Sequence, residues 1–338
     1  MALITGVSFL GQSVTQTQRL KEMHQTLGDL QRQITTQKKH ETLAGFGADA
    51  QRILQLRSEK SQLEAYSGNI DKALTRIDLM SDTMDKVADA VREITDAIRL
   101  QPEGAAFDMD DISERAQQLL DFVVDLANLE FDGRFLFAGT DAQNIPYADP
   151  NTPATTIQAE VTNWLAGGQT TTQLSNNVTA LSGAPLGFSN SISGATNASV
   201  RIDTRIEVSY GALADRSGIQ DAIRMLTFLA NMQKPDPAVD VATIPEFVQA
   251  IDYAQQIGRT ALNQIENTQT TLISKLDLIK NIKESHEQDI NLYNKLIDEE
   301  ENADTTEAIA LMQALSTQIT ASYQVTRAVS ELALVNFI

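Results

Sequence analysis

The most informative feature of the chain is the regular spacing of its apolar residues, which recur at alternating steps of three and four positions. Such spacing predicts helices that pack along one side, as in a coiled coil. The first helix is predicted within residues 1–44, and a much longer one follows a glycine-containing break at residues 45–47. The first seam consists of Leu20, Met23, Leu27, Leu30 and Ile34. The second consists of Ile53, Leu56, Leu63, Ile70, Leu74, Ile77, Met84, Val91 and Ile98.

The stretch after the second helix predicts a third helix and a β-hairpin. Asp110 or Asp111 is placed to cap this helix, because a carboxylate at a helix start accepts hydrogen bonds from free backbone amides. Asp132 and Gly133 form a turn signal before an aromatic-rich strand, which is predicted for residues 134–140. The apolar face of the third helix consists of Ile112, Ala116, Leu119, Val123 and Leu126.

Residues 142–200 lack helical periodicity, and their only charged side chains are Asp149 and Glu160. Thr, Ser, Asn, Gly and Pro are abundant there, which is typical of turns, loops and short strands. A closing strand is predicted for residues 205–210. We therefore expect a small β-rich insertion domain over residues 141–204, facing outward.

The second half of the chain mirrors the first. Thr243 and Glu246 form a capping-box signal for another long helix, which the acidic residues 298–304 separate from a final helix. This order predicts a mainly α fold, a long antiparallel coiled-coil helical bundle formed by both chain ends. The expected domains are residues 1–44 with 304–338, residues 45–140 with 205–303, and residues 141–204. The seam of the long helix consists of Phe247, Ile251, Ala254, Ala261, Ile265, Leu272, Ile279, Ile282 and Leu296.

The final helix differs from the others because apolar residues cover most of its circumference. A helix of this kind must be covered on several sides. A hairpin with the first helix covers only one side, so we expect other subunits to cover the rest. The predicted assembly interface consists of Leu20, Met23, Leu27, Leu30, Ile34, Leu315, Ile319, Tyr323, Val325, Val329, Leu332 and Phe337.

Composition narrows the classes of partner. The net charge of -19 disfavours binding to nucleic acid or to anionic membranes, because both are polyanions. The chain has no cysteine, which excludes disulfides, thiolate metal sites and cysteine nucleophiles. Polar residues interrupt the final helix well short of the roughly 20 apolar residues that a membrane span needs. The first residues lack the basic and apolar regions of a cleaved secretory signal.

No short motif predicts an enzyme. The sequence "GFGADA" at residues 45–50 has the glycine spacing of a dinucleotide loop, but it follows a helix instead of a strand, which favours a hinge. The acidic residues 108–114 are interpreted as helix caps, and residues 298–301 as a solvated run that could hold a cation. His24, His40 and His286 stand far apart, and His286 falls close to an apolar seam. We expect no catalytic residue, no cofactor and no metal.

Three segments of the chain resemble the flagellin superfamily: "ALITGVSF" at the start, "LEFDGRFLFAGT" after the third helix and "ASYQVTRAVSELALVNFI" at the end. Within that superfamily, the chain is most similar to the hook-associated proteins of the hook-filament junction. The resemblance covers everything except residues 141–204. It implies that the terminal helices form an inner tube, that the long helices form the next shell, and that the insertion faces outward.

By this resemblance, the chain is a structural protein of the bacterial flagellum that acts outside the cell, after type III export without a cleaved signal. The implied partners are copies of itself, the neighbouring hook-associated protein, flagellin and an export chaperone. Two alternatives stay open, namely a flagellin subunit of the filament and an exported surface-binding protein that uses the β-rich insertion. The small insertion fits a junction protein and a short flagellin equally.

Overall fold

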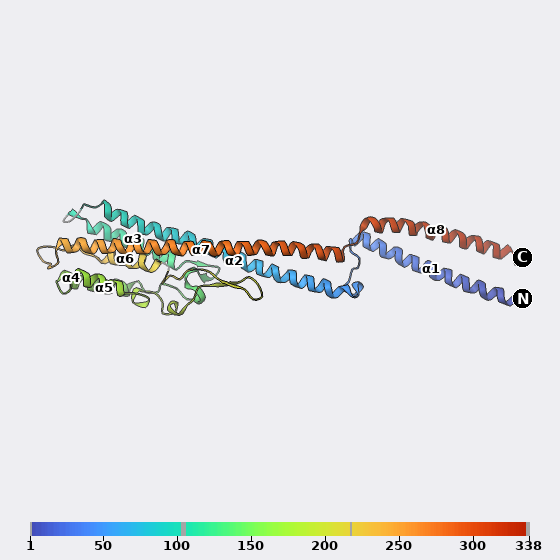
Figure 1. The fold of residues 1–338 in the computed structure, drawn as a ribbon, viewed down its shortest axis with the longest axis horizontal. Helices are drawn as coiled ribbons and strands as arrows, with labels where there is room; N and C mark the ends of the chain where they lie inside the picture. Colours follow the sequence, from blue (N-terminus) through green and yellow to red (C-terminus); the bar gives the residue numbers. More distant parts are fainter. Residues whose placement is uncertain (1, 103–105, 217, 336–338) are drawn as a thin grey trace. The chain divides into compact units, whose positions relative to one another are not determined.

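The computed structural model describes residues 2–102, 106–216 and 218–335, and the chain forms two compact units (Figure 1). Unit 1 consists of Met1–Leu63 and Gln288–Ile338, and unit 2 consists of Glu64–Glu287. Two long helices, α2 (Asp49–Leu100) and α7 (Ile244–Glu301), contribute residues to both units. The division therefore falls within helices and not in loops.

The long helices α2 and α7 pack together, as their apolar seams predict. The helices run antiparallel, since Gln269 donates a 2.7 Å hydrogen bond to Asp85, and Lys283 forms a 2.7 Å ion pair with Asp71. Residues seven positions apart are separated by about two helical turns, so they lie on the same face of the helix. The fully buried side chains of α2 in this unit include Ile70, Ile77, Met84, Val91 and Ile98, and those of α7 include Ala261, Ile265, Leu272 and Ile279.

Helices α3 (Met109–Ala127) and α6 (Ile219–Asn231) pack against each other in the same unit. The cap of α3 is Asp108, whose side chain accepts a hydrogen bond from the Asp111 amide at 3.2 Å. The prediction of Asp110 or Asp111 as the cap was wrong, because the helix begins at Met109 and places both residues in its first turn. The predicted start of α7 is confirmed: the Thr243 amide donates to the Glu246 carboxylate at 2.8 Å.

A short hairpin follows α3 and is pinned to α2. Strand β1 (Glu130–Phe131) pairs with β2 (Arg134–Phe135), and the predicted turn lies between them. Both turn residues have positive φ. Arg76 of α2 donates to the carbonyls of Phe131 and Phe135. The strand predicted to reach residue 140 is shorter, because the 3-10 helix η3 (Leu136–Asp141) begins directly after it.

The segment 141–204 is not β-rich. It contains α4 (Asn151–Leu165), α5 (Thr171–Ala180), the 3-10 turns η4 (Ala184–Leu186) and η5 (Ile192–Gly194), and a single strand, β3 (Ser199–Arg201), which pairs with β4 (Glu207–Ser209). The abundance of Thr, Ser and Asn suggested strands, but helical packing of a few apolar residues overrides that weak preference. Ile157, Val161 and Trp164 stand four and three positions apart and are all buried.

The core of unit 2 includes the insertion. Trp164, Leu174 and Val178 belong to the same buried cluster as the long helices. A buried ion pair between Asp221 and Arg224 of α6 adds polar connections, because Arg224 donates to the Leu181 carbonyl and Gln264 of α7 donates to Asp221. The insertion is therefore part of the packed core.

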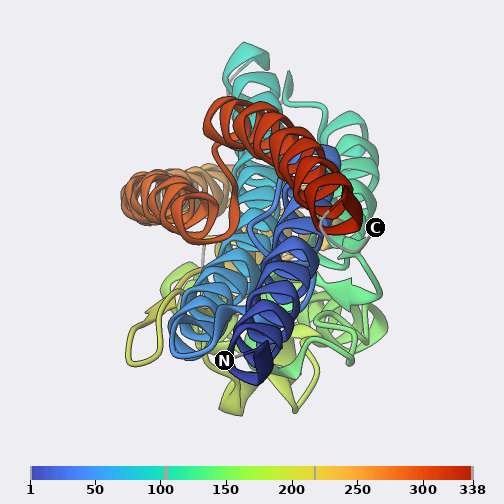
Figure 2. The ribbon, with the colours of Figure 1, turned by 90° about the vertical axis from the view of Figure 1, so that its right-hand side faces the viewer.

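Unit 1 is built around the two terminal helices, α1 (Ala2–Thr36) and α8 (Thr305–Val335). Figures 1 and 2 show these helices side by side, and they contact each other. They run antiparallel, since His24 contacts Tyr323 while Lys38 pairs with Asn302. Asp304 caps α8 by accepting hydrogen bonds from the amides of residues 306 and 307.

Candidate assembly surface of the terminal helices

The predicted interface residues fall into three groups by burial. Leu30 and Ile319 are buried where α1 and α8 meet. Tyr323 and Val325 are each 53% exposed. The half-buried residues are Leu20, Met23, Leu27, Ile34 and Leu315. Side chains are described from residue 14 to residue 328 at the two ends, so Val329, Leu332 and Phe337 lie outside the described part.

Helix α8 keeps apolar surface that α1 does not cover. Ile309, Leu311, Tyr323 and Val325 are all exposed, and Val14 is exposed on α1. Two packed helices can bury only the faces that they turn toward each other. Large apolar side chains that remain on the outside of such a pair are typical of a surface that binds another protein.

The contact between α1 and α8 is apolar, and a groove lies beside it. His24 and Tyr323 lie within hydrogen-bond distance, with 3.1 Å between the ring nitrogen Nε2 and the phenol oxygen. A groove of about 340 Å³ runs beside this pair, and its lining residues include Arg19, Leu20, Met23 and Gln318. The two helices therefore meet along a narrow seam with space on one side.

A charged cluster lies where the terminal helices join the long helices, and the sequence did not indicate it. Glu301 is only 4% exposed, and it accepts a 3.0 Å hydrogen bond from Lys38 while Arg57 lies 2.5 Å from its other oxygen. Next to it, Arg52 forms a 3.0 Å ion pair with Glu300. The acidic residues 298–301 lie at the end of α7, where basic side chains pair with Glu300 and Glu301. The interpretation of these residues as a solvated run was wrong for Glu301.

Two effects oppose each other at the Glu301 carboxyl. Burial acts to raise its pKa, but the hydrogen bond from Lys38 and the charges of Arg57 and Lys38 outweigh burial and hold the pKa below its ordinary value. The carboxyl is therefore ionised near neutral pH. No spacing rule could predict this arrangement, because Lys38 and Arg57 are more than 240 positions away from Glu301.

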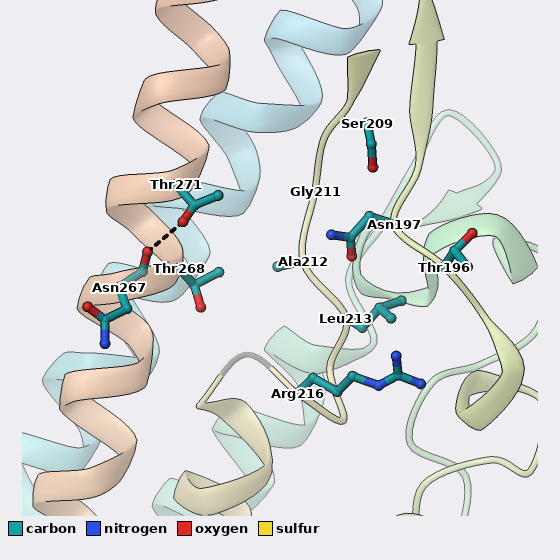
Figure 3. A pocket seen from close by; sticks show the side chains of 10 residues that line it. All are labelled: Thr196, Asn197, Ser209, Gly211, Ala212, Leu213, Arg216, Asn267, Thr268 and Thr271. Carbon is teal, nitrogen blue, oxygen red and sulfur yellow. Dashed lines mark hydrogen bonds between the residues drawn. The ribbon is translucent and has the colours of Figure 1, made fainter. Parts of the chain in front are cut away.

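A polar groove of about 560 Å³ lies in unit 2, between α7 and the chain around β3 and β4 (Figure 3). Asn267, Thr268 and Thr271 line it from α7, and the Thr271 hydroxyl donates to the Asn267 carbonyl. Among the described residues of the lining, Arg216 carries the one charge, and its guanidinium donates to the Ser193 carbonyl at 2.8 Å. These described residues do not include an acid and base pair.

The three histidines do not come together. His24 lies in the α1 and α8 contact, His40 packs against Phe46, and His286 is buried beside Tyr66 with a ring separation of 6.2 Å. In the described ranges, no group of three or more His, Asp or Glu residues could hold a metal ion. Residues 45–50 form the end of the 3-10 helix η1 (Leu43–Phe46) and the start of α2, which agrees with a hinge between helices.

No helix in the described ranges combines the length and the apolar character needed to cross a membrane. No protein-family model and no curated protein matches the chain at the level of sequence.

Solved structures do match. A structure described as a flagellar hook-associated protein from Vibrio parahaemolyticus is 13% identical, with a TM-score of 0.52 over 76% of this chain and 100% of that chain. FlgL from Bacillus cereus is 14% identical, with a TM-score of 0.48 over 73% of this chain and 98% of that chain. Identity at this level carries information on the fold alone. The chain therefore has the fold of a flagellar hook-associated protein, as the resemblance in its sequence predicted.

Proposed function

We propose that the chain is a structural axial protein of the bacterial flagellum, located at the junction between hook and filament. It polymerises through α1 and α8, which form an antiparallel coiled coil buried between subunits. Its partners are copies of itself, the neighbouring hook-associated protein and flagellin, and an export chaperone holds it before export. It acts outside the cell, as a part of the flagellum.

The observation that carries this proposal is the apolar surface left exposed on α8. Val325 and Tyr323 are both more than half exposed in the single chain. Burial of one large apolar side chain contributes about 1.5–3 kcal/mol, so several of them favour association strongly. The shared fold with a flagellar hook-associated protein supports the assignment to the flagellum.

A charged substitution on the exposed face of α8 tests the proposed assembly role of this helix. The substitution Val325→Asp places a carboxylate where the proposal requires a dry contact, and an unpaired buried charge prevents such a contact. We expect the assembled fraction, measured by sedimentation, to fall about tenfold or more. The melting of the single chain should change by no more than about 0.5 kcal/mol, because Val325 is exposed there.

Gln324→Asp is the matched control, since it adds the same charge at the preceding position of α8, which is polar and exposed. We expect this control to assemble like the wild type. Assembly of Val325→Asp at the wild-type level, or equal loss in both variants, would contradict the proposal.

Two other functions were open from the sequence. A filament flagellin would form long filaments from the purified chain alone, whereas a junction protein forms short assemblies that end at its partner, and electron microscopy of the same samples separates these outcomes. A surface-binding protein that uses residues 141–204 has less support, because most large apolar side chains of that segment lie in the core of unit 2, and Ile145 is the exception at 43% exposed.

A further inference from the structure

Two linkers of unequal length run side by side in unit 1. Residues 37–48 connect α1 to α2, and residues 302–304 connect α7 to α8. The linkers form an antiparallel bridge between Lys38 and Asn302. The Lys39 amide donates to the Glu301 carbonyl at 2.8 Å, and the Ala303 amide donates to the Gln37 carbonyl at 3.0 Å. The inner ends of the two terminal helices are therefore tied to each other through the backbone.

The side chain of Glu301 ties the same linkers to α2. Its carboxylate, at the end of α7, binds Lys38 from the first linker and Arg57 from α2. Lys39 adds a contact from its ammonium group to the Glu299 carbonyl at 2.7 Å. One buried carboxylate thus connects three segments that are distant in the sequence.

The geometry of the first linker depends on these contacts. Gln37 has a φ of 58°, a left-handed conformation that is unfavourable for a residue with a side chain. Such a conformation persists only where the surroundings impose it. The Gln37 carbonyl is the acceptor for Ala303, so the strained residue is held at the point where the linkers cross.

We propose that Glu301 is the lock of a hinge. The hinge consists of residues 37–48 and 302–304. The ion pairs of Glu301 fix the direction of α1 and α8 relative to the adjacent turns of α2 and α7 in unit 1. A hinge concentrates its backbone changes in a few residues at the ends of elements, and both linkers meet that description. A buried carboxylate without its cations is strongly unfavourable, so the segments are held or released together. The lock acts within one chain and does not rest on the proposed function.

The test is hydrogen exchange of the full chain by NMR, with Glu301→Gln compared with Glu299→Gln. The first change removes the charge of the lock, and the second removes a charge two positions earlier, on a side chain that is 60% exposed. We expect the amides of Lys39 and Ala303 to exchange about tenfold faster or more in Glu301→Gln. The substitution removes the charge of the side chain that holds the linkers, and hydrogen bonds between charged groups are stronger than neutral ones. Both amides should keep wild-type rates in Glu299→Gln.

Amides of α6 report on unit 2 and should exchange at wild-type rates in both variants. Lys38→Met is a second variant that removes one cation, and it should also accelerate exchange at Ala303. Adding Lys38→Met to Glu301→Gln should cause no further change, because the two groups act through one interaction. The proposal is wrong if Lys39 and Ala303 exchange at the same rate in Glu301→Gln and Glu299→Gln. It is also wrong if α6 loses protection together with the linkers, or if the two substitutions add.

Discussion

Gly139 shows how strongly one residue of the "DGRFLFAGT" segment is determined by its surroundings. Its φ is 60°, and a Cβ atom at this position would lie 2.2 Å from the Thr196 carbonyl oxygen and 2.5 Å from a methyl carbon of Leu213. Both contacts are far inside van der Waals distance, and one of them is to backbone. A side chain at this position thus meets both a conformational and a steric penalty.

We predict that Gly139→Ala lowers the free energy of unfolding of unit 2 by about 2 kcal/mol or more, because strain and overlap add. Gly133→Ala is the matched control, since it also has a positive φ but has open space around its Cβ position. That control should cost about 1 kcal/mol. Urea unfolding measures both values, and equal losses in the two variants would show that the close contact with Thr196 is unimportant.

Single residues were the least predictable part of this chain. The turn at Asp132 and Gly133 follows from local chemistry, and it was predicted correctly. The partners of Glu301 come from segments that only the folded chain brings together, so the sequence displayed a run of like charges and nothing more. The assembly role of Leu20 and Phe337 stays a prediction, because it concerns contacts with other subunits.

At the scale of elements, the long helices were the most predictable part. A seam that repeats over many turns leaves little choice of which face is buried, and the side chains of α2 and α7 confirm it. Helices α4 and α5 were missed because each spans only a few turns and carries few apolar residues. Their signals were the spacing of Ile157, Val161 and Trp164, and the capping box of Thr170 with Gln173.

His286 is an irregularity in the seam of α7. It stands seven positions after Ile279 and is 6% exposed, and its buried Nδ1 atom has no hydrogen-bond partner among the residues that the structure describes. We predict that His286→Leu raises the free energy of unfolding by about 1 kcal/mol, because it removes an unsatisfied buried polar atom and keeps the volume similar. Thermal unfolding followed by circular dichroism measures the change.

The matched control is the reverse substitution, Leu272→His, at the position two heptads earlier in the same seam. It should lower the stability by several times the gain from His286→Leu, because it both removes apolar contacts and buries a polar ring. If His286→Leu is less stable than the wild type, the histidine makes a favourable contact through its ring edge with Tyr66, and the prediction is wrong.

At the scale of the whole molecule, the two units differ in what holds them together. Unit 2 has a large apolar core that includes the insertion, whereas the described part of unit 1 has few fully buried side chains and one buried carboxylate at its linkers. Mirrored chain ends were evident from the sequence. The boundary inside α2 and α7 was not, because each helix continues through it without a break in periodicity.

We predict that acid opens the linkers of unit 1 before it unfolds unit 2. The pKa of Glu301 is held below its ordinary value of 4.5, so its ion pairs stabilise the folded state fully above that value and are lost as the pH falls through the lower folded-state pKa. In unit 2, burial raises the pKa of Asp215, so protonation of that group favours folding. The lowered pKa values of Asp149 and Glu246 belong to carboxyl groups at helix starts near the surface, and the loss of their charge matters less for stability.

The measurement is the exchange protection of the Ala303 amide and of α6 amides between pH 7 and pH 3, corrected for intrinsic rates. Protection of Ala303 should fall first, and in Glu301→Gln it should be low and independent of pH. Simultaneous loss of protection at both places would contradict the prediction.

The composition of unit 1 from two distant chain segments has a consequence for the order of folding. The whole of unit 2 lies between these segments in the sequence. If unit 1 folded first, the chain of unit 2 would form a very long flexible loop, and bringing the ends of that loop together has a large entropic cost. Once unit 2 has folded, the ends of that loop are neighbours, since Tyr66 packs on His286 and Asp71 binds Lys283. The loop entropy has then already been lost, and the terminal segments can associate almost as a local event. We therefore expect unit 2 to fold first and the terminal helices of unit 1 to become ordered after it.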